Sequence, residues 1–221
     1  MALYPFITLL VLLSSVPPND DVFLSFRDKD SSGSFAGHLY KALIRAGIHT
    51  FKYDKGIRRG ENMTLAVGRA LNKSKISMIV FSENYASSTR CLNELVTIME
   101  RRRTSGLVAI PIFYKVDPAE VEDRTKRYGE AFAKHEERFK EQVYRVKQWR
   151  AALKEATSLA GMVLHDRSET EFIQMVVKKV EKRLNSTLPK VLPAQSVPSY
   201  WPINLRNLAY HPFSVARELK Y

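Results

Sequence analysis

Short apolar runs alternate with longer amphipathic stretches along most of the chain. Residues 76–81 (ISMIVF) and 107–114 (LVAIPIFY) are almost continuously apolar, which is typical of strands buried on both faces of a sheet. Shorter runs that favour β structure lie at residues 22–26 (VFLSF) and 48–51 (IHTF), and a last one lies at 161–166 (GMVLHD). The pattern therefore predicts five strands.

Helical spacing fills the intervals between these runs. Apolar residues recur three and four positions apart across 35–46, 65–71, 89–99, 143–153 and 169–184. A polar helical region is predicted up to about Arg138, after a proline turn in KVDPAEV. Strands that alternate with helices indicate a parallel sheet covered on both faces. We therefore predict a doubly wound α/β domain over residues 21–185.

The stretch SSTRCLNEL, residues 87–95, combines a helix start with a carboxylate. Ser88 or Thr89 suits the N-cap position, where a hydroxyl accepts a bond from an amide that has no helical partner. Leu92 begins the apolar face of this helix, and Glu94 lies about 200° around the helix from it. Periodicity alone therefore predicts that Glu94 is exposed to solvent.

Charge and cysteine content narrow the range of partners and compartments. The chain has 221 residues, is 45% hydrophobic and carries a formal net charge of +12, which favours an anionic partner. The basic residues are spread over several helices and form no recognition motif. Nucleic acid therefore remains an alternative partner on the basis of charge alone. The single cysteine, Cys91, excludes an intrachain disulfide and fits a reducing compartment. We expect the protein in the cytoplasm, with the nucleus as a second location.

The two ends of the chain differ from its centre. Residues 1–20 include an apolar run of the length of a secretory signal, but the basic residues that precede such a run are missing. This run is also shorter than the roughly 20 apolar residues of a membrane span. It is either an artefactual leader, or a genuine signal or anchor that would direct the chain to the secretory pathway or a membrane. Residues 186–221 are rich in proline and are predicted to be an irregular tail.

Familiar motifs for cofactor chemistry are missing from the sequence. There is no GxxxxGK loop, no GxGxxG after the first strand and no HExxH among the histidines, so the sequence indicates neither a standard phosphate loop nor a metal site. In a doubly wound sheet the ligand lies at the carboxyl ends of the strands. The loops there begin at Arg27, Lys52, Ser82 and Lys115.

Several ordered blocks resemble plant Toll/interleukin-1 receptor (TIR) domains over about residues 20–184. They include DVFLSF, HLYKALIRAGIHTF, RRGEN, ISMIVFSENYASS, CLNEL, IPIFYKVDPAEV and GEAFAKHEERF. The resemblance implies a flavodoxin-like fold with a five-stranded parallel sheet, used as the signalling module of plant disease-resistance receptors. In those receptors a nucleotide-binding domain and leucine-rich repeats follow, so this chain is expected to be a TIR-only or truncated member.

The resemblance also implies an activity. Many plant TIR domains self-associate and hydrolyse NAD⁺ or NADP⁺, releasing nicotinamide and signalling nucleotides, and the family's catalytic glutamate falls on Glu94. Such a carboxylate stabilises an oxocarbenium-like ribosyl cation. Arg27, Arg59 and Gly60 correspond to segments that border the pocket, where cations suit a pyrophosphate. No tightly bound cofactor is implied, since the dinucleotide is the substrate.

The sequence departs from the family pattern at several places, including the loop FRDKDSS after the first strand, which lacks the family's glycine and second arginine. Arg90 stands where the family usually has tryptophan, four residues before the glutamate, and its guanidinium is the candidate contact for a base or phosphate. Gly37 and His38 replace a serine–histidine pair of one self-association surface, and Lys126 replaces a glycine of a second surface. Two functions therefore stay open: an NAD(P)⁺ glycohydrolase, and a catalytically impaired adaptor or decoy that binds other TIR domains.

Overall fold

The computed structural model describes residues 21–27, 34–52, 63–164 and 166–187. Within this part of the chain the five predicted strands form one parallel sheet in the order β2-β1-β3-β4-β5. This order is that of the flavodoxin-like doubly wound fold, so the predicted fold class is confirmed. The strands are β1 (Val22–Ser25), β2 (Thr50–Lys52), β3 (Ile76–Phe81), β4 (Val108–Phe113) and β5 (Met162–Val163).

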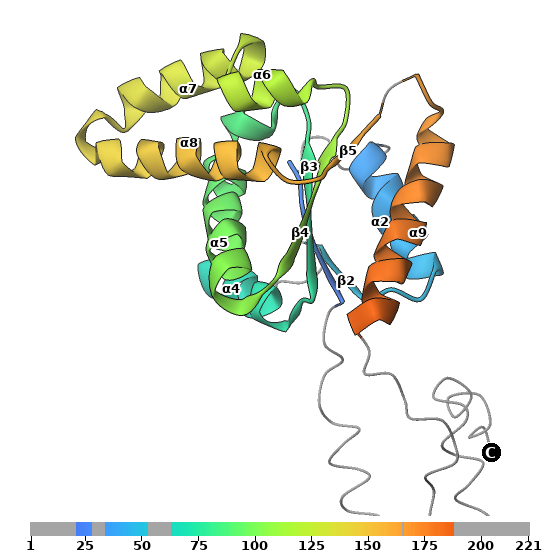
Figure 1. Ribbon diagram of the computed structural model, residues 1–221. Helices are drawn as coiled ribbons and strands as arrows, with labels where there is room; N and C mark the ends of the chain where they lie inside the picture. The colour runs from blue at the N-terminus through green and yellow to red at the C-terminus, as the bar shows by residue number, and fades with distance from the viewer. Residues whose placement is uncertain (1–20, 28–33, 53–62, 165, 188–221) are drawn as a thin grey trace, which may run out of the picture. The chain divides into compact units, whose positions relative to one another are not determined.

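Helices cover both faces of the sheet (Figure 1). They are α2 (Phe35–Arg45), α4 (Met63–Lys73), α5 (Thr89–Ser105), α6 (Pro118–Asp123), α7 (Lys126–Arg138), α8 (Val143–Thr157) and α9 (Glu169–Thr187). Figure 1 shows α2 and α9 on one face, and α4, α5 and α8 on the other. Among the residues that the structure describes, no helix is both long enough and apolar enough to cross a membrane.

Alternate side chains of the strands supply two separate cores, as period-two geometry requires. Leu24 and Met78 point to the face covered by α2 and α9, where they pack with residues such as Leu39. Phe23 and Ile79 point to the opposite face, against α4, α5 and α8. Burial on both faces explains why β1 and β3 are almost continuously apolar in sequence, with only Ser25 and Ser77 polar.

The predicted proline turn after β4 is wrong, because Pro118 begins helix α6. Proline fits the first position of a helix, where an amide proton would have no helical acceptor. The side chain of Asp117 caps this helix by accepting a hydrogen bond from the Ala119 amide at 2.8 Å. The two capping features of this short helix are therefore present in the sequence.

The carboxyl ends of β1 and β3 bring the candidate site together. Ser25, the last residue of β1, pairs in register with Ile79 in β3. After β3 the chain makes a short 3-10 helix, η2 (Tyr85–Ser87), and then enters α5. The first turns of α5 therefore lie beside the end of β1, with which α5 makes direct contacts.

Candidate active site

The amino end of α5 is fixed by the cap that the sequence predicted. The Ser88 hydroxyl accepts a hydrogen bond from the Cys91 amide at 3.3 Å, which satisfies one amide of the first turn. The Cys91 thiol is fully buried and donates to the Phe26 carbonyl at 3.4 Å. These contacts attach the first turn of α5 to the segment that follows β1.

Glu94 lies one turn further along α5 and is only 4% exposed. The prediction of a solvent-exposed carboxylate is therefore wrong, because the side of α5 that carries Glu94 faces the end of β1. The Ser25 hydroxyl donates to Glu94 Oε2 at 2.7 Å, and Arg90 Nη1 donates to Glu94 Oε1 at 2.6 Å. A carboxylate buried in this way is stabilised by charge-assisted hydrogen bonds to both of its oxygens.

Arg90 links three parts of the site. One nitrogen of its guanidinium forms the ion pair with Glu94, and the other, Nη2, donates to the Phe26 carbonyl at 3.0 Å. The Arg90 side chain is 19% exposed and that of Glu94 3% exposed, so water screens this pair less than a surface pair. Arg90 and Cys91 therefore share the Phe26 carbonyl as acceptor.

Tyr85 extends this hydrogen-bonded group on the side of β1. Its hydroxyl lies 3.1 Å from Ser25 Oγ and donates to the Cys91 carbonyl at 3.0 Å. Burial raises the pKa of the Tyr85 phenol well above 10.0, and the acidic groups of Cys91 and Glu94 raise it further. Tyr85 is therefore a neutral support for Ser25, which in turn orients Glu94.

A cavity of about 380 Å³ opens beside the carboxylate. It is lined by Val67, Gly68, Thr89, Arg90, Asn93, Glu94 and Thr97, which come from α4 and α5. Its volume falls within the range of small-molecule sites, roughly 300–1,000 Å³. A buried carboxylate, an arginine and a carboxamide converge on this one cavity. No group of residues suited to a metal ion occurs in the described part of the chain.

Arg27, another predicted pocket residue, is not among the residues that line this cavity. Arg27 Nη1 donates to the Asn84 carbonyl at 2.8 Å and also contacts the Ser87 hydroxyl, so it ties the end of β1 to η2. Arg59 and Gly60 lie outside the residues that the structure describes. Their predicted roles stay predictions.

Gly37 and His38 lie in α2, on the face of the sheet opposite α5. Gly37 is buried, whereas His38 lines a groove between α2 and α9 with a volume of about 640 Å³. His38 Nδ1 lies 2.8 Å from Glu169 Oε1, and the Tyr114 hydroxyl donates to Glu169 Oε2 at 3.1 Å. Of these two predicted self-association residues, His38 lines the groove between the helices, and Gly37 is not among its lining residues.

Lys126, predicted for a second association surface, begins α7 with a φ of +47°. This left-handed conformation favours glycine, which gives a physical reason for the glycine that the family resemblance places here. The Lys126 ammonium pairs with Glu120, and the hydrogen bond to this carboxylate raises the pKa of the lysine.

Two supporting residues of the site, Ser25 and Tyr85, are missing from the sequence-based prediction. Ser25 is the one polar residue within the apolar run VFLSF, and it lies at the carboxyl end of the predicted strand. A hydroxyl buried at that end of a doubly wound sheet is a usable indication of a site. No comparable indication marks Tyr85, whose role depends on the turn after β3.

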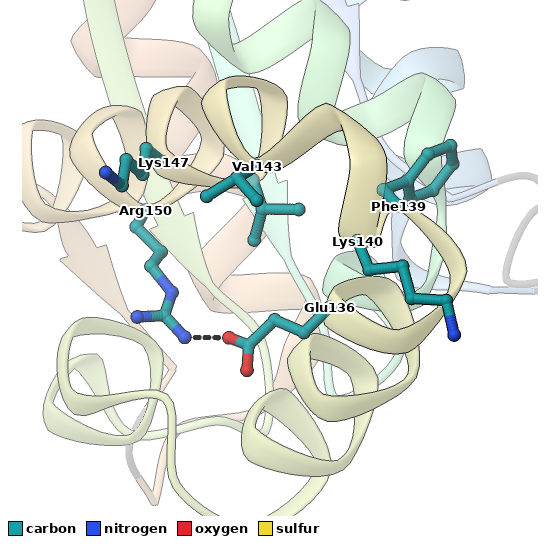
Figure 2. Close-up of a pocket in the computed structure, with 7 residues that line it drawn as sticks. Glu136, Phe139, Lys140, Val143, Lys147 and Arg150 are labelled. Atoms are coloured by element: carbon teal, nitrogen blue, oxygen red, sulfur yellow. Dashed lines mark ion pairs between the residues drawn. The ribbon is translucent and has the colours of Figure 1, made fainter.

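A second cavity, of about 310 Å³, lies between α7 and α8. Figure 2 shows the carboxylate of Glu136 directed at Arg150, with which it forms an ion pair, while the Lys140 and Lys147 side chains diverge from this pair. Glu136 is the only carboxylate among the residues lining this cavity, and it is exposed. The cavity at Glu94 is therefore the better candidate for chemistry.

Comparisons with known proteins agree on one family. The family model described as TIR domain matches residues 21–197. Disease resistance protein RPV1 of Vitis rotundifolia is 46% identical over 165 residues, covering 74% of this chain and 12% of RPV1. TMV resistance protein N of Nicotiana glutinosa is 40% identical over 165 residues, covering 74% of this chain and 14% of that protein. The chain thus spans only a small part of these relatives.

A solved structure gives the same result for the fold. The TIR domains of the activated Roq1 resistosome, which directly recognises the pathogen effector XopQ, superpose with a TM-score of 0.69 at 40% identity. The match covers 72% of this chain and 98% of the Roq1 TIR chain. Sequence and structure comparisons therefore point to the same domain.

Proposed function

The chain belongs to the TIR domain family, and we propose that it acts in plant disease-resistance signalling as a self-associating NAD(P)⁺ glycohydrolase with Glu94 as its essential carboxylate. The observation that carries the proposal is the buried Glu94 carboxylate at the wall of a cavity of about 380 Å³. The disease-resistance role is supported by relatives such as RPV1 and N, which carry that description.

The proposed reaction breaks the bond between nicotinamide and ribose. The bonding electrons leave with nicotinamide, which becomes neutral, and positive charge develops on the ribose ring. A fixed carboxylate next to the ring stabilises that charge without reorganising during the step. Water then adds to the ribosyl carbon and loses a proton, which gives an ADP-ribose product.

Ser25 and Tyr85 are assigned positioning roles in this scheme. Ser25 holds Oε2 of Glu94 at 2.7 Å, so the carboxylate keeps one orientation. Tyr85 in turn supports Ser25 at 3.1 Å. Neither residue lines the cavity, so their effect on the reaction passes through Glu94.

Catalysis requires free energy to break a hydrogen bond of Arg90, because Arg90 already donates to Oε1 of Glu94. A ribose hydroxyl that approaches this oxygen must displace the Arg90 hydrogen bond. The guanidinium, once displaced, has the charge and planar geometry to bind the substrate pyrophosphate. Arg90 is therefore proposed to exchange a carboxylate partner for a phosphate partner when substrate binds.

The same ion pair favours a second candidate function, that of a non-catalytic adaptor or decoy. Both oxygens of Glu94 accept hydrogen bonds from the protein itself, and breaking a partly buried pair is costly. If Arg90 is not displaced, the domain retains its association surfaces without the reaction.

Nicotinamide release from NAD⁺ and NADP⁺ by the concentrated protein distinguishes these candidates. We expect release that disappears in Glu94→Gln and persists in Glu100→Gln, a matched change at an exposed residue of the same helix. Absence of Glu94-dependent release, even when the protein is oligomerised by fusion, would overturn the enzyme proposal.

Arg90→Trp separates an active enzyme from an impaired one. Activity in both wild type and variant shows that Arg90 does not block the site. Activity in the variant alone supports the adaptor, in which Arg90 has blocked an otherwise intact site.

A further inference from the structure

The amino-terminal edge of the sheet carries a concentration of positive charge. In this fold strands start and helices end at one edge, and Figure 1 shows α2, α4, α5 and α9 ending where β1 begins. Ten basic residues lie within the last three turns of these helices or in the segments that follow them. We call them the basic face: Arg45, Lys73, Lys75, Arg101, Arg102, Arg103, Lys178, Lys179, Lys182 and Arg183.

Few carboxylates offset this charge. Asp21 pairs with Lys75 at 2.9 Å, and Glu155 is shared between Arg102 at 3.4 Å and Arg103 at 2.6 Å. Glu100 and Glu181 lie on the same helix ends. Among the residues that the structure describes, these four carboxylates accompany the ten cations of the basic face, which leaves a net positive field there.

A cavity of about 440 Å³ lies within the basic face, between the start of β4 and the end of α9. Arg102, Lys179 and Arg183 are among its lining residues, and no carboxylate is. Strand β5 pairs only with Ile112 and Phe113, so it does not cover the earlier residues of β4. The cavity is therefore suited to an anion of the size of a phosphate-containing headgroup.

The dipoles of the helices account for only part of this arrangement. Cations near a helix carboxyl end are favourable because they face the negative end of the dipole. The dipole does not require cations of two different helices, α5 and α9, to line one cavity that lacks a carboxylate. Lys179 also lies two turns before the end of α9, beyond the last turn in which the dipole acts.

The apolar amino-terminal segment leads to the same face. Residues 2–13 are apolar in sequence except for their tyrosine and threonine, and the chain from them enters the domain at Asp21, next to the start of β1. An apolar segment combined with a basic surface is the combination that attaches proteins to anionic membranes. We propose that the basic face docks the domain on an anionic lipid bilayer, with a headgroup phosphate in the cavity of Arg102, Lys179 and Arg183.

Vesicle sedimentation with the full chain tests this proposal. We expect binding to phosphatidylcholine vesicles to increase when phosphatidylserine is added, and this increase to be lost at high salt. The triple variant Lys179→Gln, Lys182→Gln, Arg183→Gln should lose on the order of a hundredfold in affinity for the anionic vesicles. Binding to phosphatidylcholine alone gives the baseline contributed by apolar segments.

The matched control carries the same loss of charge at another surface. Lys134, Lys140 and Lys147 are exposed residues of the α7–α8 region, and their replacement by glutamine should leave anionic-vesicle binding within about twofold. Equal losses in the two triple variants would overturn the docking of this face. Binding of a labelled duplex RNA to the same variants tests nucleic acid as the alternative partner. If the basic-face variant loses RNA binding but retains vesicle binding, nucleic acid is the partner and the membrane proposal is overturned.

Discussion

At the scale of single residues, the site is defined by how one carboxylate is held inside the protein. Glu94 has lost almost all contact with water, and Ser25 and Arg90 replace the hydrogen bonds that water would make. Tyr85 completes the group from the far side of Ser25. Residues that replace solvent around a charge are energetically coupled, so their substitutions should not be additive.

A double-mutant cycle measures this coupling for Arg90 and Glu94. Removing either partner leaves the other in a partly buried position, so we expect a coupling free energy of about 1–3 kcal/mol in urea unfolding. The cycle for Arg103 and Glu155, an ion pair in which the arginine is 59% exposed, is the internal control and should give less than about 1 kcal/mol. Similar values for the two pairs would contradict the burial argument.

The raised pKa of Tyr85 predicts a specific loss of stability in alkali. In the unfolded chain this phenol ionises near its ordinary pKa of 10.0, while in the folded protein burial keeps it protonated. The contribution of Tyr85 is therefore complete below about pH 10 and is lost as the pH rises from there toward the folded pKa.

Urea unfolding of wild type and Tyr85→Phe over this pH range provides the measurement. At neutral pH the variant should be less stable by about 1 kcal/mol, because two hydroxyl contacts are lost. The difference should narrow above about pH 10, since phenylalanine has no proton to lose. Parallel pH dependences of the two proteins would contradict the prediction.

At the scale of elements, the start of α7 shows how backbone geometry selects residue types. Arg124 and Lys126 both adopt left-handed backbone conformations, with φ of +55° and +47°. The chain here turns sharply between α6 and α7, and Gly129 packs against the carbonyl of Arg124. A β-carbon at Gly129 would lie 2.6 Å from that carbonyl oxygen, which is a clash with rigid backbone.

Two substitutions in this turn should therefore have opposite effects. Gly129→Ala should lower the free energy of unfolding by about 1–3 kcal/mol, because backbone must shift to admit the methyl group. Lys126→Gly should raise the melting temperature, because glycine adopts a positive φ without strain. Thermal unfolding of the two variants checks both signs, and a stabilised Gly129→Ala would contradict the geometry.

Most elements of the fold follow from the sequence because most strands and helices have a regular apolar period. ISMIVF at residues 76–81 is a strand with the same bounds in the structure, and Ser88 caps α5 as predicted. Helix α6 was not predicted, since six residues are too few to show a period. Glu94 was predicted on the wrong side of α5. Periodicity identifies the face of a helix that packs on the sheet, but it does not show that a second face is buried against the end of β1.

At the scale of the whole domain, the three candidate surfaces lie at different places around the parallel sheet. The cavity at Glu94 lies at the carboxyl ends of the strands, the basic face lies at the amino ends, and the groove of α2 and α9 lies along one side. Arg45 and Lys178 belong to both the groove and the basic face, whereas the cavity at Glu94 shares no lining residue with the groove or with the cavity of Arg102. Substitutions at the Glu94 cavity should therefore be separable in effect from substitutions on the other two surfaces.

Self-association is tested at the groove between α2 and α9. Ala42 is half-buried in this groove, so Ala42→Arg would fill part of it and add a charge. We expect sedimentation velocity to show a shift toward monomer, with lower nicotinamide release per molecule at high protein concentration. Ala151→Arg, at an exposed position of α8, is the matched control. If it reduced self-association and nicotinamide release as much as Ala42→Arg, the groove would not be the association surface.

The contacts of Cys91 turn the only thiol of the chain into an internal reporter of the site. Cys91 is fully buried, and its thiol shares the Phe26 carbonyl with Arg90. When Arg90 leaves that carbonyl, the wall around the sulfur loosens, so alkylation of wild-type protein by a maleimide should accelerate. The rate of labelling therefore reports how readily Arg90 leaves the Phe26 carbonyl in solution, without any engineered probe.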